Sequence, residues 1–122
     1  MTERSVATCH CQAVKISFEM VGGLDSLRRC DCSLCRRKYP AAVSGLVSDV
    51  RVERGADSLG LYQFGTMTAR HYFCKSCGIH VYHQRRSNPA EIGVNVACVE
   101  GLDPRIAGTA KWVDGVTHPN DA

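Results

Sequence analysis

Seven of the eight cysteines lie in three short clusters, and they are the residues of this chain best suited to chemistry. The clusters are Cys9-His-Cys11, Cys30-Asp-Cys32-Ser-Leu-Cys35 and Cys74-Lys-Ser-Cys77. Thiols this close in sequence do not readily pair with each other as disulfides. Thiolates delivered in short-spaced groups from separate chain segments are, in contrast, the preferred ligands of Zn²⁺. The spacing therefore predicts metal binding.

The number of clustered cysteines predicts two sites of different kinds. Seven ligands make one closed site of four and one site of three, and a three-thiolate zinc with a vacant position is typical of a catalytic or substrate-binding metal. Spacing alone leaves open which clusters share a metal. A disulfide framework is disfavoured in a cytosolic chain, and three clusters with ligand spacing disfavour ordinary buried cysteines.

Length and charge limit the class of protein. The 122 residues predict one domain, 1–122, with a modest core that metal sites would help to stabilise. The N-terminus lacks the apolar segment of a signal peptide, and no apolar run approaches the roughly 18 residues that span a bilayer. We therefore expect a cytoplasmic protein with no membrane partner. The net charge of +3 is mild and its basic residues are interspersed with acidic ones, so a nucleic-acid partner is not expected.

The elements that position the cysteines are expected to be short strands. Apolar and polar residues alternate with period two, which predicts half-buried strands. These segments are 14–19, 50–53, 59–64, 70–73, 79–83 and 92–96. Their number and spacing predict an all-β sandwich or folded sheet with little helix. The strands 70–73 and 79–83 should form a hairpin with a metal-binding turn at its tip.

The three clusters differ in their expected backbone. Gly78 directly follows Cys77, as in a zinc knuckle, where the residue after the second cysteine often needs a positive φ. Arg36 follows Cys35 instead, so that cluster better fits the first turn of a short helix, 33–38, with Ser33 as a candidate N-cap. The i and i+2 spacing of Cys9 and Cys11 would point both thiols the same way in an extended chain.

Nearly the whole chain resembles the glutathione-dependent formaldehyde-activating enzyme family, which includes centromere protein V-like members and has the Mss4-like fold of folded β-sheets. The matching motifs are Cys9-His-Cys11-Gln-Ala-Val14, Cys30-Asp-Cys32-Ser-Leu-Cys35-Arg-Arg37, His71-Tyr-Phe-Cys74-Lys-Ser-Cys77-Gly78, Arg86-Ser-Asn-Pro89, Gly93-Val-Asn-Val96 and Asp114-Gly115…His118-Pro119. The resemblance implies an enzyme, a zinc-dependent carbon–sulfur lyase that condenses glutathione or a related thiol with formaldehyde to S-hydroxymethylglutathione.

The resemblance also implies how the cysteines are shared between two zinc ions. Four of them would hold a structural zinc, namely Cys9, Cys11, Cys74 and Cys77. Three would hold the catalytic zinc, namely Cys30, Cys32 and Cys35, and would leave its fourth position for water or a thiol. Zinc would lower the pKa of the bound thiol. Arg36 and Arg37, with Lys38 beside them, are candidates to bind the carboxylates of glutathione, because guanidinium groups match carboxylates bidentately. A solvated basic turn is the other interpretation of this run.

The remaining candidates have weaker grounds. His71 and His83 flank the knuckle and are candidates for acid–base or supporting roles, whereas His10 is expected to pack or face solvent. Cys98 ends an apolar strand and is expected in the core, with a fourth-ligand role as the alternative. Asn88 and Asn95 are candidates to hydrogen-bond a peptide-like ligand. Two other functions stay open: a non-catalytic zinc-stabilised module that binds a protein or nucleic acid, and a lyase acting on another thiol adduct.

Overall fold

Short β-strands make up most of the regular secondary structure in this computed structural model, which describes residues 4–38 and 41–113. The strands are β1 (Ser5–Thr8), β2 (Lys15–Phe18), β3 (Arg28–Cys30), β4 (Ala42–Leu46), β5 (Arg51–Arg54), β6 (Leu59–Tyr62), β7 (Arg70–Cys74), β8 (His80–Gln84), β9 (Glu91–Asn95) and β10 (Lys111–Val113). The predicted all-β class is confirmed. The motif Asp114 to Pro119 lies outside the described residues.

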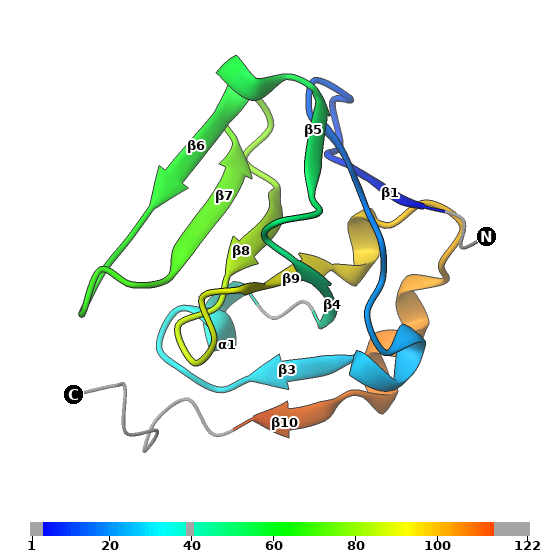
Figure 1. The fold of residues 1–122 in the computed structure, drawn as a ribbon, viewed down its shortest axis with the longest axis vertical. Helices are drawn as coiled ribbons and strands as arrows, with labels where there is room; N and C mark the ends of the chain where they lie inside the picture. Colours follow the sequence, from blue (N-terminus) through cyan, green and yellow to red (C-terminus); the bar gives the residue numbers. More distant parts are fainter. Residues whose placement is uncertain (1–3, 39–40, 114–122) are drawn as a thin grey trace.

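Seven of these strands form the larger sheet, in the order β10-β3-β4-β9-β8-β7-β6. All its neighbouring strands are antiparallel except β10 and β3, which are parallel. Between β3 and β4 only one residue pair, Arg28 with Ala42, is in register. The β3–β10 pair is therefore joined only weakly to the rest of the sheet. Figure 1 shows this pair below the strands β6 to β9, with α1 between the pair and those strands at one end.

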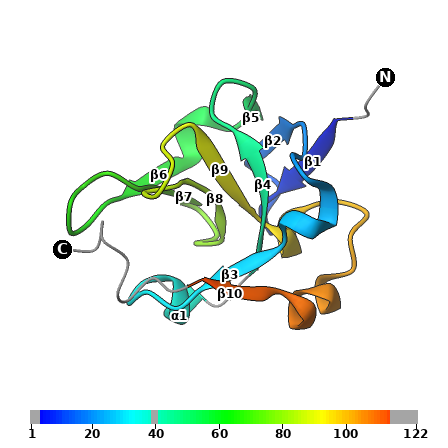
Figure 2. The same cartoon turned by 60° about the horizontal axis from the view of Figure 1, so that its bottom comes forward.

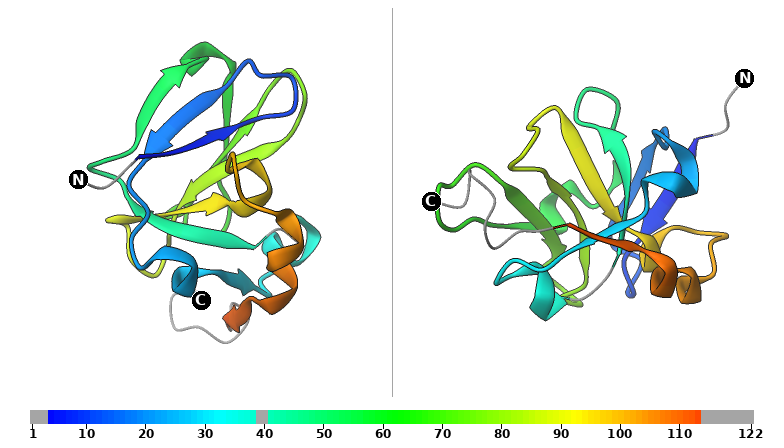
Figure 3. Two further views of the ribbon diagram at one scale, coloured as in Figure 1. Left: turned by 90° about the vertical axis from the view of Figure 1, so that its right-hand side faces the viewer. Right: turned by 90° about the horizontal axis from the view of Figure 1, so that it is seen from below.

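The smaller sheet, β1-β2-β5, covers one side of the larger sheet. Figure 3 shows β1 and β2 crossing in front of the green and yellow strands of the larger sheet. The two sheets meet in one buried apolar cluster, which includes Ile16 and Phe18 from β2 and Val43, Ile92 and Val94 from β4 and β9. These residues occupy alternate strand positions, as a half-buried sheet requires.

Helix is confined to short segments in the part of the chain that the structure describes. α1 (Cys35–Lys38) is a single α-helical turn, and the rest are 3₁₀ turns: η1 (Gly23–Ser26), η2 (Ala56–Ser58), η3 (Val96–Cys98) and η4 (Pro104–Thr109). No helix in the described ranges is both long and apolar enough to cross a membrane. Figure 2 shows α1 beside β3, so the cysteines of both elements come together.

Candidate functional site

The first cysteine cluster joins two distant parts of the chain. The Sγ atoms of Cys9, Cys11, Cys74 and Cys77 all lie within 4.8 Å of one another, and we call this group the tetrathiolate. Cys11 Sγ is 3.7 Å from the Sγ atoms of both Cys9 and Cys74, which is 63 residues further along the chain. Four thiolates around a tetrahedral zinc at about 2.3 Å would be about 3.8 Å apart. The donor set and its spacing therefore fit zinc.

The local backbone explains how these thiols converge. The chain around Cys11 is a tight turn, not the extended chain in which both thiols would point the same way. Gln12 has a φ of 68°, and its N–H donates to the carbonyl of Cys9 at 3.2 Å. At the other end Gly78 has a φ of 79° and donates to the carbonyl of Cys74 at 2.7 Å. The knuckle prediction is thus confirmed. Backbone N–H groups of Cys11 and Ile79 lower the pKa of Cys77 to about 6, which favours the thiolate that a metal needs.

The second cluster comes from one short segment. Cys30 ends β3, Cys35 begins α1, and Cys32 lies between them; their Sγ atoms are within 4.8 Å of one another. We call this group the trithiolate. The Cys35 N–H donates to Cys32 Sγ at 3.3 Å, so Cys32 takes the capping position predicted for Ser33. The neighbouring thiols of Cys30 and Cys35 hold the pKa of Cys32 far below its ordinary value, again favouring thiolate. This donor set also fits zinc, with three protein ligands.

A cavity of about 340 Å³ opens onto the trithiolate. Its lining comprises Arg28, Arg29, Cys30, Cys32, Cys35, Lys38, Ala41, Ala42, Phe64, Ala69, His71, His80, His83, Arg85, Arg86, Ser87, Asn95 and Val113. All three cysteines of the trithiolate face this space, and none of the tetrathiolate does. A metal in the trithiolate would therefore be accessible to a small ligand, whereas the tetrathiolate lies elsewhere.

A lysine and three histidines form one wall of the cavity. Lys38 Nζ is 3.1 Å from His71 Nδ1 and 3.4 Å from His80 Nε2, and the rings of His71 and His83 stack with centroids 5.4 Å apart. Burial, then the charge of Lys38, lowers the pKa of His71 to about 4 and that of His80 to about 2. Neutral imidazoles accept hydrogen bonds, so both rings can hold the Lys38 ammonium in place.

Sequence reasoning missed His80 because of a local irregularity. Residues three apart on a regular strand point to opposite faces. Tyr72 pairs with Tyr82 but Phe73 pairs with His80, so β8 carries an extra residue there. This bulge puts His80 on the same face as His83. Gly93 makes room for the cluster, because a Cβ there would lie 2.5 Å from His83 Cε1.

The other predicted residues are placed as follows. Arg36 and Arg37 are exposed and do not line the cavity. Arg37 Nη1 donates to the Ser33 carbonyl at 2.6 Å. The contact of these two arginines with glutathione therefore stays a prediction. Cys98 is buried as predicted, and its thiol donates to the His80 carbonyl at 3.6 Å. Asn95 lines the cavity and donates to that same carbonyl at 2.9 Å.

Asn88 and His10 lie outside this cavity, and both are exposed. Asn88 Oδ1 accepts the N–H of Ala90 at 3.1 Å, which gives it a role in the turn between β8 and β9. Four arginines, in contrast, line the cavity although we had not singled them out for binding: Arg28, Arg29, Arg85 and Arg86. Their separation in sequence concealed them, because only the fold brings β3 and the end of β8 together.

Comparison with known proteins agrees with this geometry. The family model described as glutathione-dependent formaldehyde-activating enzyme matches residues 4–113. A crystal structure of a Rhodobacter sphaeroides protein, a structural genomics target, is similar to this chain with 56% sequence identity and a TM-score of 0.85. The match covers 88% of this chain and 99% of that one.

Proposed function

Because the chain belongs to the glutathione-dependent formaldehyde-activating enzymes, we propose that its trithiolate cavity is where glutathione adds to formaldehyde. The product is S-hydroxymethylglutathione, so the enzyme makes a carbon–sulfur bond in one direction and breaks it in the other, as a lyase does. The family match favours this reaction over a non-catalytic binding module. The thiol and the aldehyde are its small-molecule partners, and no membrane or nucleic acid takes part.

Two zinc ions per chain are part of the proposal. The tetrathiolate would hold a structural ion that links β1 to the β7–β8 hairpin, and the trithiolate would hold the catalytic ion. When bound there, zinc would supply a site that keeps the incoming thiol as its nucleophilic thiolate. Thiolate ligands persist in a reducing compartment, which supports a cytoplasmic location.

Lys38 is the residue we assign to the aldehyde oxygen. Its ammonium has three N–H groups, and the rings of His71 and His80 are placed to accept two of them. The third can donate to the oxygen of formaldehyde, where negative charge develops as the C–S bond forms. The thiol loses one proton and the product hydroxyl gains one, so the reaction needs no other reagent.

The observation that carries the proposal is the placement of the cavity. A metal in the trithiolate would face a space lined by Lys38, whereas the tetrathiolate has no residue in that lining. Chemistry with a small thiol is therefore better placed at the trithiolate than at the tetrathiolate. The six-residue span from Cys30 to Cys35 also ties together little of the fold, so its metal is free to exchange a ligand.

The test combines metal analysis with exchange spectroscopy. Protein purified without chelator should contain two zinc ions per chain, and Cys32→Ser protein one. NMR exchange spectroscopy should show that wild type accelerates interconversion of glutathione plus formaldehyde and S-hydroxymethylglutathione above the uncatalysed rate. Cys32→Ser protein at equal zinc is the control, and Lys38→Met should reduce the rate while retaining two zinc ions. Equal rates for wild type and Cys32→Ser would refute the proposal.

A further inference from the structure

Arg85 is a buried cation whose hydrogen bonding is incomplete. Its side chain is 5% exposed. Nη1 donates to Ser44 Oγ at 2.8 Å and to Glu91 Oε1 at 3.2 Å, while the buried Nη2 has no hydrogen-bond partner among the described residues. A buried guanidinium nitrogen without an acceptor is costly, because its desolvation is not repaid. Arg85 lines the cavity, so an acceptor can come from a ligand.

A second arginine, Arg28, adds a positive charge beside Arg85. Arg28 Nη2 is 3.9 Å from Glu91 Oε1, the same oxygen that accepts from Arg85. Two guanidinium groups therefore share one carboxylate. Burial, then the charge of Arg28, lowers the pKa of Arg85 to about 10, which leaves it protonated at neutral pH. The pair retains one positive charge that Glu91 does not neutralise.

The other lysine and arginine side chains of the lining add further positive charge. Arg29, Arg86 and Lys38 also line the cavity, and no aspartate or glutamate is among its lining residues in the described ranges. The three thiolates with a divalent ion would carry only a single negative charge. The end of the cavity beside Arg28 and Arg85 is thus suited to an anion, and guanidinium groups match the planar carboxylate in particular.

The distance from this pair to the trithiolate suits one small molecule. Arg28 and Cys30 are two residues apart on β3, hence about 7 Å apart along the strand and on the same face. Both line the cavity. A molecule of tripeptide size can therefore place a thiol at the trithiolate and a carboxylate at the arginine pair.

We propose that Arg28 and Arg85 form a carboxylate-binding subsite that makes the enzyme select carboxylate-bearing thiols over neutral ones. The inference rests on the proposed function for its thiol end, since it takes the trithiolate as the place where the sulfur binds. It assigns the carboxylate contact to residues inside the cavity, unlike the sequence-based prediction for Arg36 and Arg37.

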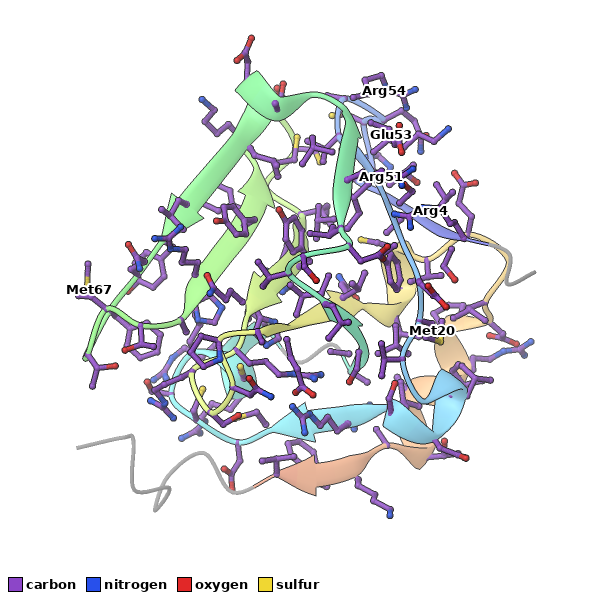
Figure 4. The ribbon with its side chains drawn as sticks, viewed as in Figure 1. Arg4, Met20, Arg51, Glu53, Arg54 and Met67 are labelled. Carbon is purple, nitrogen blue, oxygen red and sulfur yellow. The ribbon has the colours of Figure 1, made fainter. Side chains whose placement is uncertain are left out.

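The first experiment measures thiol preference. Exchange rates with formaldehyde are compared for glutathione and for the neutral thiol 2-mercaptoethanol, in wild type, Arg28→Gln and Arg85→Lys. We expect wild type to prefer glutathione and both variants to lose that preference roughly tenfold to a hundredfold, the effect of a charge-assisted hydrogen bond. Arg51→Gln is the matched control, because Arg51 is exposed on β5 and Figure 4 shows it away from β3. The double variant Arg36→Gln/Arg37→Gln tests the earlier prediction in the same assay.

The second experiment separates this inference from the proposed function. S-methylglutathione keeps both carboxylates but has no free thiol, and its binding to the zinc-loaded protein is measured by calorimetry. Binding that is lost in Arg28→Gln and retained in Arg51→Gln supports the subsite even if wild type catalyses neither thiol. Unchanged binding in Arg28→Gln, or a wild type with equal preference for both thiols, would overturn it. Should Arg85→Lys fail to fold, the half-buried Arg28 still decides the result.

Discussion

The two cysteine clusters use the same ligand chemistry but differ in what they join and what they face. The tetrathiolate brings together cysteines 63 residues apart, two of which are fully buried or nearly so, Cys9 at 1% and Cys74 at 0% exposure. The trithiolate lies within a single strand–turn–helix segment, its three cysteines are half-buried, and it opens onto the cavity. We therefore propose that one cluster stabilises the fold and that the other binds a ligand.

If both clusters hold a metal, the role of each site should follow from the chain segments that it joins. Metal binding free energy becomes folding free energy to the extent that the ligands are separated in the unfolded chain. Ligands within a span of six residues, Cys30 to Cys35, are already near one another there, so their metal would contribute less to stability. The surrounding side chains differ too, since the lysine and histidine wall lies only at the trithiolate.

The largest expected effect comes from removing one ligand of each cluster. Cys74→Ser should abolish soluble folded protein, because structural zinc binding is worth about 10–16 kcal/mol and whole-domain stability about 5–15 kcal/mol. Cys32→Ser should remain folded and lose one metal. The yield of soluble protein is measured first for both variants, and the protein recovered is then analysed by circular dichroism, thermal unfolding and zinc analysis. Equal destabilisation by the two variants would show that the structural and catalytic roles are misassigned.

A smaller effect is expected at the histidine wall. Gly93→Ala would place a Cβ 2.5 Å from Cε1 and 3.0 Å from Nε2 of His83, so the ring must shift. Overpacking of this kind costs about 1–3 kcal/mol, measurable by urea unfolding, and should lower the exchange rate while both zinc ions stay bound. Gly108→Ala is the matched control, since a Cβ there meets no atom within 4 Å. Similar losses of stability in both variants would contradict the packing argument.

The sequence predicted the parts of this comparison that depend on local spacing. The knuckle, its positive φ at Gly78, the β7–β8 hairpin and the strands β2, β5, β6 and β9 are confirmed, because each follows from period-two alternation or from turn chemistry. The strands β1, β3, β4 and β10 were not predicted. β3 and β10 have only three residues each, too few for a period to be visible.

The residues that line the cavity could not be predicted from local spacing, because only the fold brings them together. His80 joins His83 only because of the bulge in β8, and Arg28 and Arg85 contact the same carboxylate, that of Glu91, only because the fold brings β3 and the end of β8 together. Neither contact leaves a pattern in the sequence near these residues. The basic run that was visible, Arg36 and Arg37, lies on the exposed side of α1. Proximity in sequence to the trithiolate was therefore a poor guide for these two arginines, whereas Lys38, the next residue of the run, does line the cavity.

The smallest expected effect is a pH dependence confined to the cavity side. Burial and the charge of Lys38 lower the pKa of His71 to about 4, from an ordinary value near 6.5. Between these two pH values the unfolded chain binds a proton that the folded protein excludes. The free energy of unfolding therefore falls as the pH drops through this window, and the contribution of His71 to stability is complete only above it. His71→Gln should make that fall less steep. Urea unfolding at pH 7, 6 and 5 in fixed zinc measures it, and protonation of the thiolates cancels in the difference from wild type. The control is His10→Gln, because His10 is exposed and lies on the tetrathiolate side. If the free energy of unfolding has the same slope against pH in wild type and His71→Gln, the prediction is refuted.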